Sequence, residues 1–134
     1  MPSGKRHYRL TLADALSAHE RALKLGGING IPNPGLVEAA IARPYSGYCP
    51  TISQKAAALV QSMAGNHGFA DGNKRTTLIL VHTLVSKSGY VLVLLEGDDE
   101  RALEEMILAV VLKTMSVEDA RQWFKRRIRR PTTD

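Results

Sequence analysis

The sequence predicts an all-α fold: a small bundle of five to six helices with at most a minor β-hairpin or strand. Apolar residues recur at helical spacing along most of the chain. Three of these segments begin at helix-capping pairs: Thr11 with Asp14, Thr51 with Gln54, and Ser116 with Asp119. The chain has 134 residues, which suits one domain, and only 5% of them are aromatic, so its core must be aliphatic.

The N-terminal part of the chain predicts one helix followed by a loop. The helix begins at Thr11 and ends at the glycine pair 26–27. Its apolar stripe consists of Leu12, Ala15, Leu16, His19 and Leu23. A single histidine on such a stripe is usually a core or boundary residue, and we expect this of His19. Residues 28–34 contain two prolines, two asparagines and a glycine, which predicts a loop.

The middle of the chain predicts three helices. The first covers residues 35–42, and Pro44 forbids its extension. The second begins at Thr51 and stops at Gly65. Its apolar stripe consists of Ile52, Ala56, Leu59, Val60 and Met63. The third runs over residues 73–88 and is apolar around most of its circumference, so we expect it to be the most buried helix of the bundle.

The C-terminal part predicts a short strand and two more helices. Residues 90–95 are rich in β-branched and apolar side chains, which favours a strand or a buried extended segment. A turn at 97–99 then leads into a helix. Its inward residues are Leu103, Met106, Ile107, Val110 and Val111. The last helix begins at Ser116. Its inward residues are Val117, Ala120, Trp123, Phe124 and Ile128.

These elements predict a single domain over residues 8–130, with a disordered N-terminus at 1–7 and a tail at 131–134. Cys49 is the only cysteine, so no intramolecular disulfide can form, which favours a reducing compartment. The sequence has no apolar signal core at its start and no apolar run near the roughly 20 residues of a membrane span. We therefore expect a soluble, cytoplasmic protein with no membrane partner.

The net charge of +5 is concentrated near the C-terminus. The cations there are Arg121, Lys125, Arg126, Arg127, Arg129 and Arg130. We expect a solvated helix face followed by a frayed tail, with no direct contact to nucleic acid. The alternative from a different functional class is a non-catalytic module that uses this basic tail to bind nucleic acid or a regulatory partner.

A polar loop at residues 67–76 separates two apolar helices. Lys74 and Arg75 stand where the second of these helices begins, although the first turn of a helix normally favours acids because its free N–H groups are positive. Gly72 permits a tight turn of the backbone close to a ligand. Exposed N–H groups flanked by two cations predict an anion site, and phosphate is its natural ligand.

Two further residues of this loop can carry chemistry beside a phosphate. Asp71 supplies a carboxylate, which together with phosphate oxygens suits Mg²⁺. His67 can act as a base near neutral pH. Other interpretations stay open: Asp71 as a helix cap, the cations as solvated side chains, and His67 with Asp71 as two ligands of a transition metal. The glycine pattern matches neither GxxxxGK[ST] nor GxGxxG.

Residues 43–50 form a proline-bracketed segment with two tyrosines. The pattern predicts a loop or short hairpin. It is equally compatible with a plain connection and with a lid or an edge that docks a peptide.

The stretch His67-Gly68-Phe69-Ala70-Asp71-Gly72-Asn73-Lys74-Arg75 resembles the signature of the Fic/Doc family, HxFx(D/E)GN(G/K)R. Segments on both sides resemble the death-on-curing (Doc) branch of that family: residues 8–21, 26–27, 35–44, 89–90 and 116–124. The resemblance implies a small Fic-type helical bundle. It also implies an enzyme that moves a phosphate-containing group from a nucleotide to a protein hydroxyl.

The resemblance assigns roles to the motif residues. His67 would take the proton from the hydroxyl, and Asp71 would hold Mg²⁺. The phosphates of ATP would be bound by Gly72, Asn73, Lys74 and Arg75. A flap that aligns the target peptide would consist of Arg43, Tyr45, Ser46, Gly47 and Tyr48.

Two positions favour the Doc branch over adenylyl-transferring relatives. Lys74 replaces their glycine, and Leu78 replaces their second arginine. Resemblance to the Doc branch implies phosphoryl transfer to a threonine of a translation factor such as elongation factor Tu, with adenylyl transfer as the alternative. Gly72, however, matches the wider family rather than the alanine found in that branch. Because no glutamate lies in an inhibitory (S/T)xxxE(G/N) pattern, a separate antitoxin is expected as partner in a toxin–antitoxin module.

Overall fold

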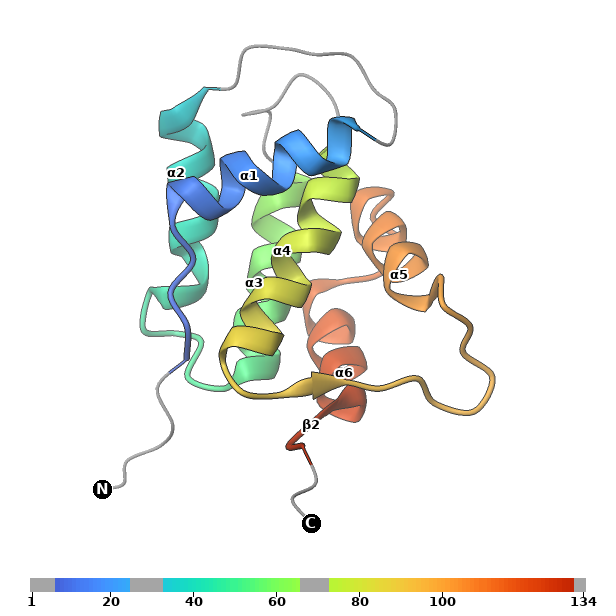
Figure 1. Cartoon of the computed structure of the whole chain (residues 1–134). Helices are drawn as coiled ribbons and strands as arrows, with labels where there is room; N and C mark the ends of the chain where they lie inside the picture. The colour runs from blue at the N-terminus through green and yellow to red at the C-terminus, as the bar shows by residue number, and fades with distance from the viewer. Residues whose placement is uncertain (1–6, 25–32, 66–72, 132–134) are drawn as a thin grey trace, which may run out of the picture.

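The computed structural model describes residues 7–24, 33–65 and 73–131 as six α-helices, one 3₁₀ turn and a two-stranded sheet (Figure 1). The elements are α1 (Leu12–Leu23), α2 (Pro34–Ala42), η1 (Arg43–Tyr45), α3 (Ile52–Ala64), α4 (Asn73–Lys87), β1 (Val91–Leu92), α5 (Ala102–Val111), α6 (Val117–Arg127) and β2 (Ile128–Arg129). This confirms the predicted all-α class with its minor β element. None of the helices in the described ranges is long and apolar enough to cross a membrane.

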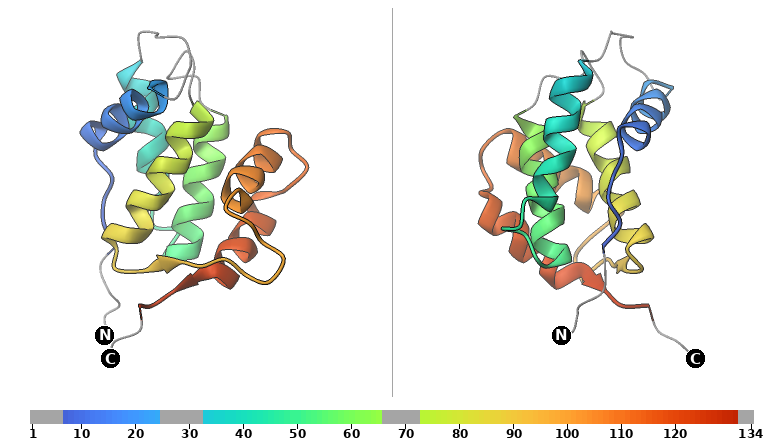
Figure 2. Two further views of the ribbon diagram at one scale, coloured as in Figure 1. Left: turned by 45° about the vertical axis from the view of Figure 1, so that its right-hand side comes forward. Right: turned by 90° about the vertical axis from the view of Figure 1, so that its left-hand side faces the viewer.

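The helices are arranged around a central pair, α3 and α4 (Figure 2). Helices α1 and α2 lie on one side of this pair, and α5 and α6 lie on the other. Helix α3 packs against α2, η1, α4, α5 and α6, and it contributes eight buried residues. Among the residues that the structure describes, the buried apolar side chains of the core are aliphatic or methionine except for Phe124.

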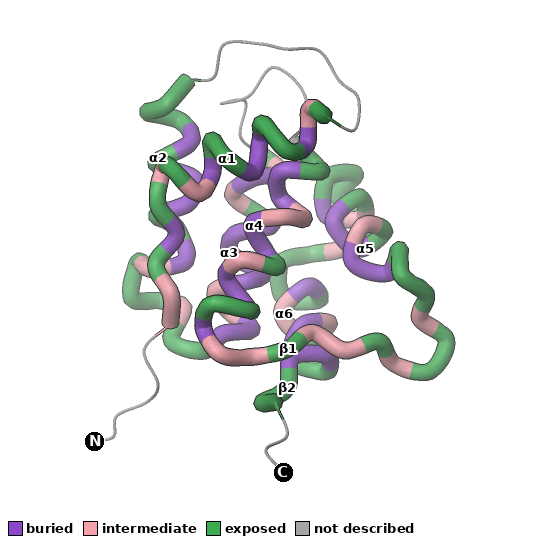
Figure 3. Tube along the Cα trace, viewed as in Figure 1, coloured by how far each residue is buried: buried purple, intermediate pink, exposed green. Residues whose placement is uncertain are grey.

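The prediction that α4 is the most buried helix is wrong, because α3 occupies that place. Leu80, Val81, Leu84 and Val85 of α4 are buried, but its opposite face, which includes His82, is exposed (Figure 3). The sequence misled because Leu78 and Ile79 extend the apolar surface of α4 beyond the buried stripe. Both are only half-buried, in a groove between α4 and α1.

The predicted helix starts are confirmed by their caps. The Thr11 hydroxyl accepts the Asp14 N–H at 3.1 Å, and the Asp14 carboxylate accepts the Thr11 N–H at 2.9 Å. Thr51 and Gln54 make the same reciprocal pair. Such a cap stabilises a helix by about 1 kcal/mol. The start of α2 was placed one residue late, because Asn33 caps it and Pro34 fills its first position.

Three apolar residues expected to face the core are exposed: Leu16 (36%), Val111 (42%) and Val117 (37%). In α1 the buried positions are held by Ala15, Ala18, His19 and Ala22, so close packing of small residues displaces Leu16 outward. Helix α1 ends at Leu23, and the glycine pair 26–27 expected to end it lies outside the described residues.

The C-terminal basic segment is ordered rather than frayed. Strand β2 pairs antiparallel with β1, with Val91 opposite Arg129 and Leu92 opposite Ile128. The predicted strand over 90–95 is therefore only two residues long. The expectation of a frayed tail is wrong for residues 128–129, because their backbone pairs with β1. The predicted disordered N-terminus and tail lie outside the described residues except for His7 and Pro131.

Arg127 fixes this segment to the loop that precedes α5. Its guanidinium donates to both carboxylate oxygens of Asp98, at 2.8 and 3.1 Å, and lies 4.1 Å from the centre of the Trp123 ring. The Asp98 carboxylate also accepts the Leu95 N–H at 2.8 Å. The hydrogen bond from Arg127, with that of Leu95, lowers the pKa of Asp98 from 3.8 to about 2.

Candidate anion-binding site at the start of helix α4

The structure describes part of the predicted phosphate site. His67, Asp71 and Gly72 lie outside the described residues. Asn73 is the first residue of α4, and Lys74 and Arg75 follow it in the first turn with exposed side chains. The motif segment is therefore joined to the N-terminus of a fifteen-residue helix whose next turn is anchored in the core. That is the mount expected for an anion site.

The anchor consists of two threonines. Thr76 is fully buried and Thr77 is 2% exposed, so α4 cannot rotate about its axis without disrupting the packing of the core. The first turn contains no acidic residue, and α4 as a whole contains no Asp or Glu. The helix dipole and the two cations therefore act in the same direction and favour a bound anion.

Lys74 is paired with another helix. Its ammonium nitrogen Nζ lies 3.9 Å from Oε1 of Glu104, in the first turn of α5. Both side chains keep about 40% of their surface exposed, so this is a weak, water-screened pair. Glu104 was not singled out from the sequence. The extra cation of the motif, Lys74, is the one sequence signal that indicates a nearby acidic side chain.

The C-terminal end of α3 and the N-terminal end of α4, which flank the motif, lie at one end of the bundle (Figure 1). The C-terminal end of α1 and the N-terminal end of α2 lie at the same end. Four helix ends thus surround the attachment points of the motif segment. Lys74 and Arg75 belong to this end of the bundle, because they lie in the first turn of α4.

The five predicted flap residues lie elsewhere. Arg43 and Tyr45 belong to η1, and the residues up to Tyr48 continue toward the N-terminal end of α3. The motif segment follows the C-terminal end of α3. Arg43 lines one cavity with Gln61, in the C-terminal half of α3, so the segment runs alongside that helix. Neither Lys74 nor Arg75 lines this cavity, and the described residues of the segment form no hairpin.

Tyr45 has a visible structural task. Its hydroxyl accepts the Leu10 N–H at 2.9 Å and donates to the Tyr8 carbonyl at 2.6 Å. Burial raises the pKa of Tyr45 above its ordinary value, so this hydroxyl keeps its proton near neutral pH. Tyr48, in contrast, is 89% exposed. The two tyrosines of the segment therefore differ sharply in what they can do.

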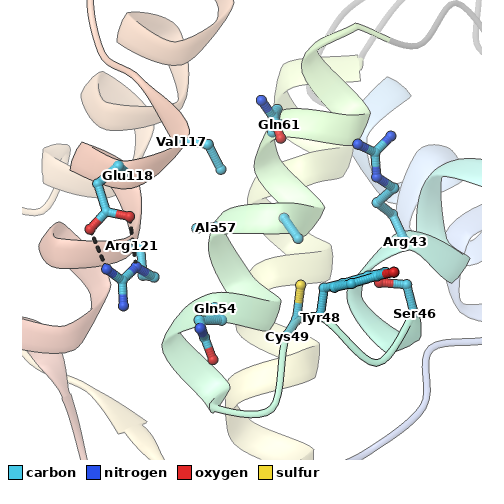
Figure 4. A pocket seen from close by; sticks show the side chains of 11 residues that line it. Arg43, Ser46, Tyr48, Cys49, Gln54, Ala57, Gln61, Val117, Glu118 and Arg121 are labelled. Atoms are coloured by element: carbon cyan, nitrogen blue, oxygen red, sulfur yellow. Dashed lines mark hydrogen bonds and ion pairs between the residues drawn. The ribbon is translucent and has the colours of Figure 1, made fainter.

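Arg43, Ser46 and Tyr48 line a cavity of about 510 Å³ between the segment after α2, helix α3 and helix α6 (Figure 4). Ala57 and Ala58 form its floor, and the wall from α6 includes an ion pair between Glu118 and Arg121. Gly47 adopts a positive φ of 97° at the turn beside it. The cavity is polar on both walls and is distinct from the region around Lys74.

The described residues contain no cluster of three His, Cys, Asp or Glu side chains that suits a metal ion. His19 is 5% exposed on the core face of α1, as expected for a core histidine. Cys49 is half-buried, and its carbonyl accepts a hydrogen bond from Lys55 at 2.8 Å. The interpretation of His67 and Asp71 as transition-metal ligands gains no further ligand from the described part of the chain.

Comparison with known proteins agrees with the motif. A model of the Fic/DOC family matches residues 9–85, which span α1 to α4. A relative described as Toxin Doc, from Mycolicibacterium smegmatis, is 38% identical over 73 residues. That match covers 51% of this chain and 56% of the relative, so the chain spans about half the length of the relative it matches. Because the family model covers more than half of the sequence, this protein belongs to the Fic/DOC family.

Proposed function

We propose that the protein transfers the γ-phosphoryl group of ATP to a Ser or Thr hydroxyl of another protein. The observation that carries this proposal is the start of α4. Its first turn carries the exposed cations Lys74 and Arg75 and contains no acid. This arrangement suits phosphate, and the neighbouring His67 and Asp71 of the family signature supply a base and a carboxylate.

The proposed reaction balances as a single displacement. An imidazole nitrogen of His67 takes the hydroxyl proton as the target oxygen bonds to the γ-phosphorus. The bond from that phosphorus to the β–γ bridging oxygen breaks, and ADP leaves with the electron pair. The Gly72 and Asn73 backbone, with Lys74 and Arg75, would bind the phosphate oxygens throughout. Asp71 fits Mg²⁺ by its donor chemistry, and the ion would offset phosphate charge when bound.

Substitution of His67 tests the base. His67→Ala should lower the rate of transfer by a factor of 10² or more, because general-base catalysis typically contributes that much. Binding of MgATP, measured by calorimetry, should change little. Full transfer activity in His67→Ala would show that another group takes the proton.

Adenylyl transfer is the second candidate, supported by Gly72, which matches the wider family. It is separated from phosphoryl transfer by two labels of ATP. With purified elongation factor Tu as target, phosphoryl transfer deposits label from the γ position only. Label from the α position on the target would instead establish adenylyl transfer. Intact-protein mass gives the same answer, because one phosphate and one AMP differ widely in mass.

Toxicity and control by a separate antitoxin follow from the same proposal. The relative named Toxin Doc supports this, as does the groove of about 440 Å³ between α1 and α4. Leu78 and Ile79 line that groove, and its formally charged lining residues, Arg21 and Lys87, are both basic. An acidic amphipathic helix fits such a surface. Expression of the chain alone should arrest growth, and co-expression of the antitoxin should restore it.

A nucleic-acid module built on the basic segment gains no support. Arg127 is 8% exposed and held by Asp98, and Arg121 is paired with Glu118. These two cations have internal tasks. Steep, salt-dependent binding to nucleic acid that is lost on truncation after Ile128 would revive this alternative.

A further inference from the structure

We propose that Glu104 of α5 sets how strongly the start of α4 holds a nucleotide, by competing with phosphate for Lys74. The inference rests on the proposed function, because it concerns the same anion site. Glu104 would be a positioning residue that acts through Lys74. It would not touch the reacting atoms itself.

The charge distribution around Lys74 makes Glu104 distinctive. Helix α4 contains three Lys and Arg residues and no acid, so it offers Lys74 no counter-charge of its own. Helix α5 packs against α4 and supplies two acids in its first turn, Glu104 and Glu105. In the described part of the chain, only Glu104 forms an ion pair with Lys74, at 3.9 Å.

The pair is well suited to exchange. Both side chains are about 40% exposed, so neither is fixed by packing and each can rotate away at low cost. When no nucleotide is bound, the carboxylate holds the ammonium group toward α5. When phosphate binds Lys74, the ammonium group must leave the carboxylate, and the loss of that ion pair weakens the complex. Glu104 thus opposes retention of a nucleotide, including the product of the reaction.

Removing the charge of Glu104 should increase the affinity for nucleotide, whereas damage to the site would decrease it. Glu104→Gln removes the charge and keeps the shape, so MgATP should bind roughly two- to five-fold more tightly at 0.1 M salt. The KM for ATP should fall by a similar factor while kcat stays within two-fold. At 0.5 M salt the gain should largely disappear, because the screening length is then only about 4 Å.

The chain offers a matched control. Glu105→Gln removes the same charge from the same turn of α5, at an exposed position outside the pair, and should leave MgATP affinity almost unchanged. Glu104→Asp keeps the charge and should restore most of the wild-type affinity. In a Lys74→Gln background, Glu104→Gln should have no effect, because its partner is already absent.

Calorimetric titration of MgATP into the wild type and these variants decides the matter. If the wild type binds MgATP and Glu104→Gln behaves like Glu105→Gln, the role of Glu104 is refuted while the proposed function stands. The same holds if Glu104→Gln binds more weakly, or if its effect persists without Lys74. If the wild type binds no MgATP, both the role of Glu104 and the proposed function fall.

Discussion

The hydroxyl of Tyr45 ties the segment before α1 to the end of α2, and its removal can be predicted quantitatively. Tyr45→Phe keeps the ring and deletes two hydrogen bonds, to the Leu10 N–H and the Tyr8 carbonyl. Leu10 is 4% exposed, so its N–H has little access to replacement water. At about 1 kcal/mol for each bond, the free energy of unfolding should fall by about 2 kcal/mol.

Thermal unfolding provides the assay. For 134 residues the entropy of unfolding is about 0.28 kcal/mol/K, so a loss of about 2 kcal/mol lowers Tm by about 7 °C. Tyr48→Phe is the matched control. Tyr48 belongs to the same segment but is 89% exposed, so the Tm of the Tyr48→Phe protein should stay within 1 °C of the wild-type value. A Tyr45→Phe protein that melts less than 2 °C below wild type would refute the structural role.

Variants at the same two tyrosines separate a role in the fold from a role in target recognition. If Tyr45 serves only the fold, Tyr45→Phe should transfer phosphate at 25 °C as fast as wild type. If the segment also contacts the protein substrate, Tyr48→Ala should raise the KM for that substrate while leaving Tm unchanged. Loss of transfer activity in Tyr45→Phe without any loss of Tm would favour the flap role that the sequence resemblance implied.

Three further outcomes are expected. Lys113 has a positive φ of 63°, so Lys113→Gly should raise the free energy of unfolding by about 0.5–1 kcal/mol in urea titrations, and Lys113→Ala should not. Phe124 is fully buried with its ring edge-on to Trp123, so Phe124→Ala should cost about 3–5 kcal/mol by the same measurement, and Phe124→Leu clearly less. The pKa of Asp98 is about 2 when folded and about 3.9 when unfolded, so its contribution to stability is complete above pH 5 and is lost as pH falls from about 4 to 2. Stability curves of Asp98→Asn should be flatter over that window, and an unchanged slope would contradict the Arg127 contact.

Local signals in the sequence were sufficient for much of the fold. The reciprocal caps at Thr11 and Thr51 placed two helix starts because the bonds that define them lie within four residues. Long-range contacts were not predictable in this way. No local pattern around Tyr45 predicts that its hydroxyl forms hydrogen bonds with Leu10 and Tyr8, which lie 35 and 37 positions earlier in the chain. Asp98, the partner of Arg127, lies 29 positions away, so the basic run by itself predicts only a solvated tail.

The same distinction between local sequence signals and long-range contacts applies to the candidate site. The motif alone predicted an anion site at Lys74 and Arg75, because the placement of cations at a helix start is a local property of the sequence. The neighbour of Lys74 comes from α5, thirty positions later, and only the fold reveals it. The position of residues 43–48 also depends on the fold. They lie beside α3, where Arg43 lines the same cavity as Gln61 of that helix.

The place of α6 in the bundle has a consequence for how the protein is made. Helix α3, at the centre, is covered on one side by α6, and β1 finds its partner only in residues 128–129. A ribosome-bound chain that ends before residue 117 therefore lacks this cover, and the face of α3 that packs against α6 stays open to water. The helices on either side of the motif, α3 and α4, are synthesised before α6. During synthesis the packing around α3 is therefore complete only after α6 and β2 have left the ribosome.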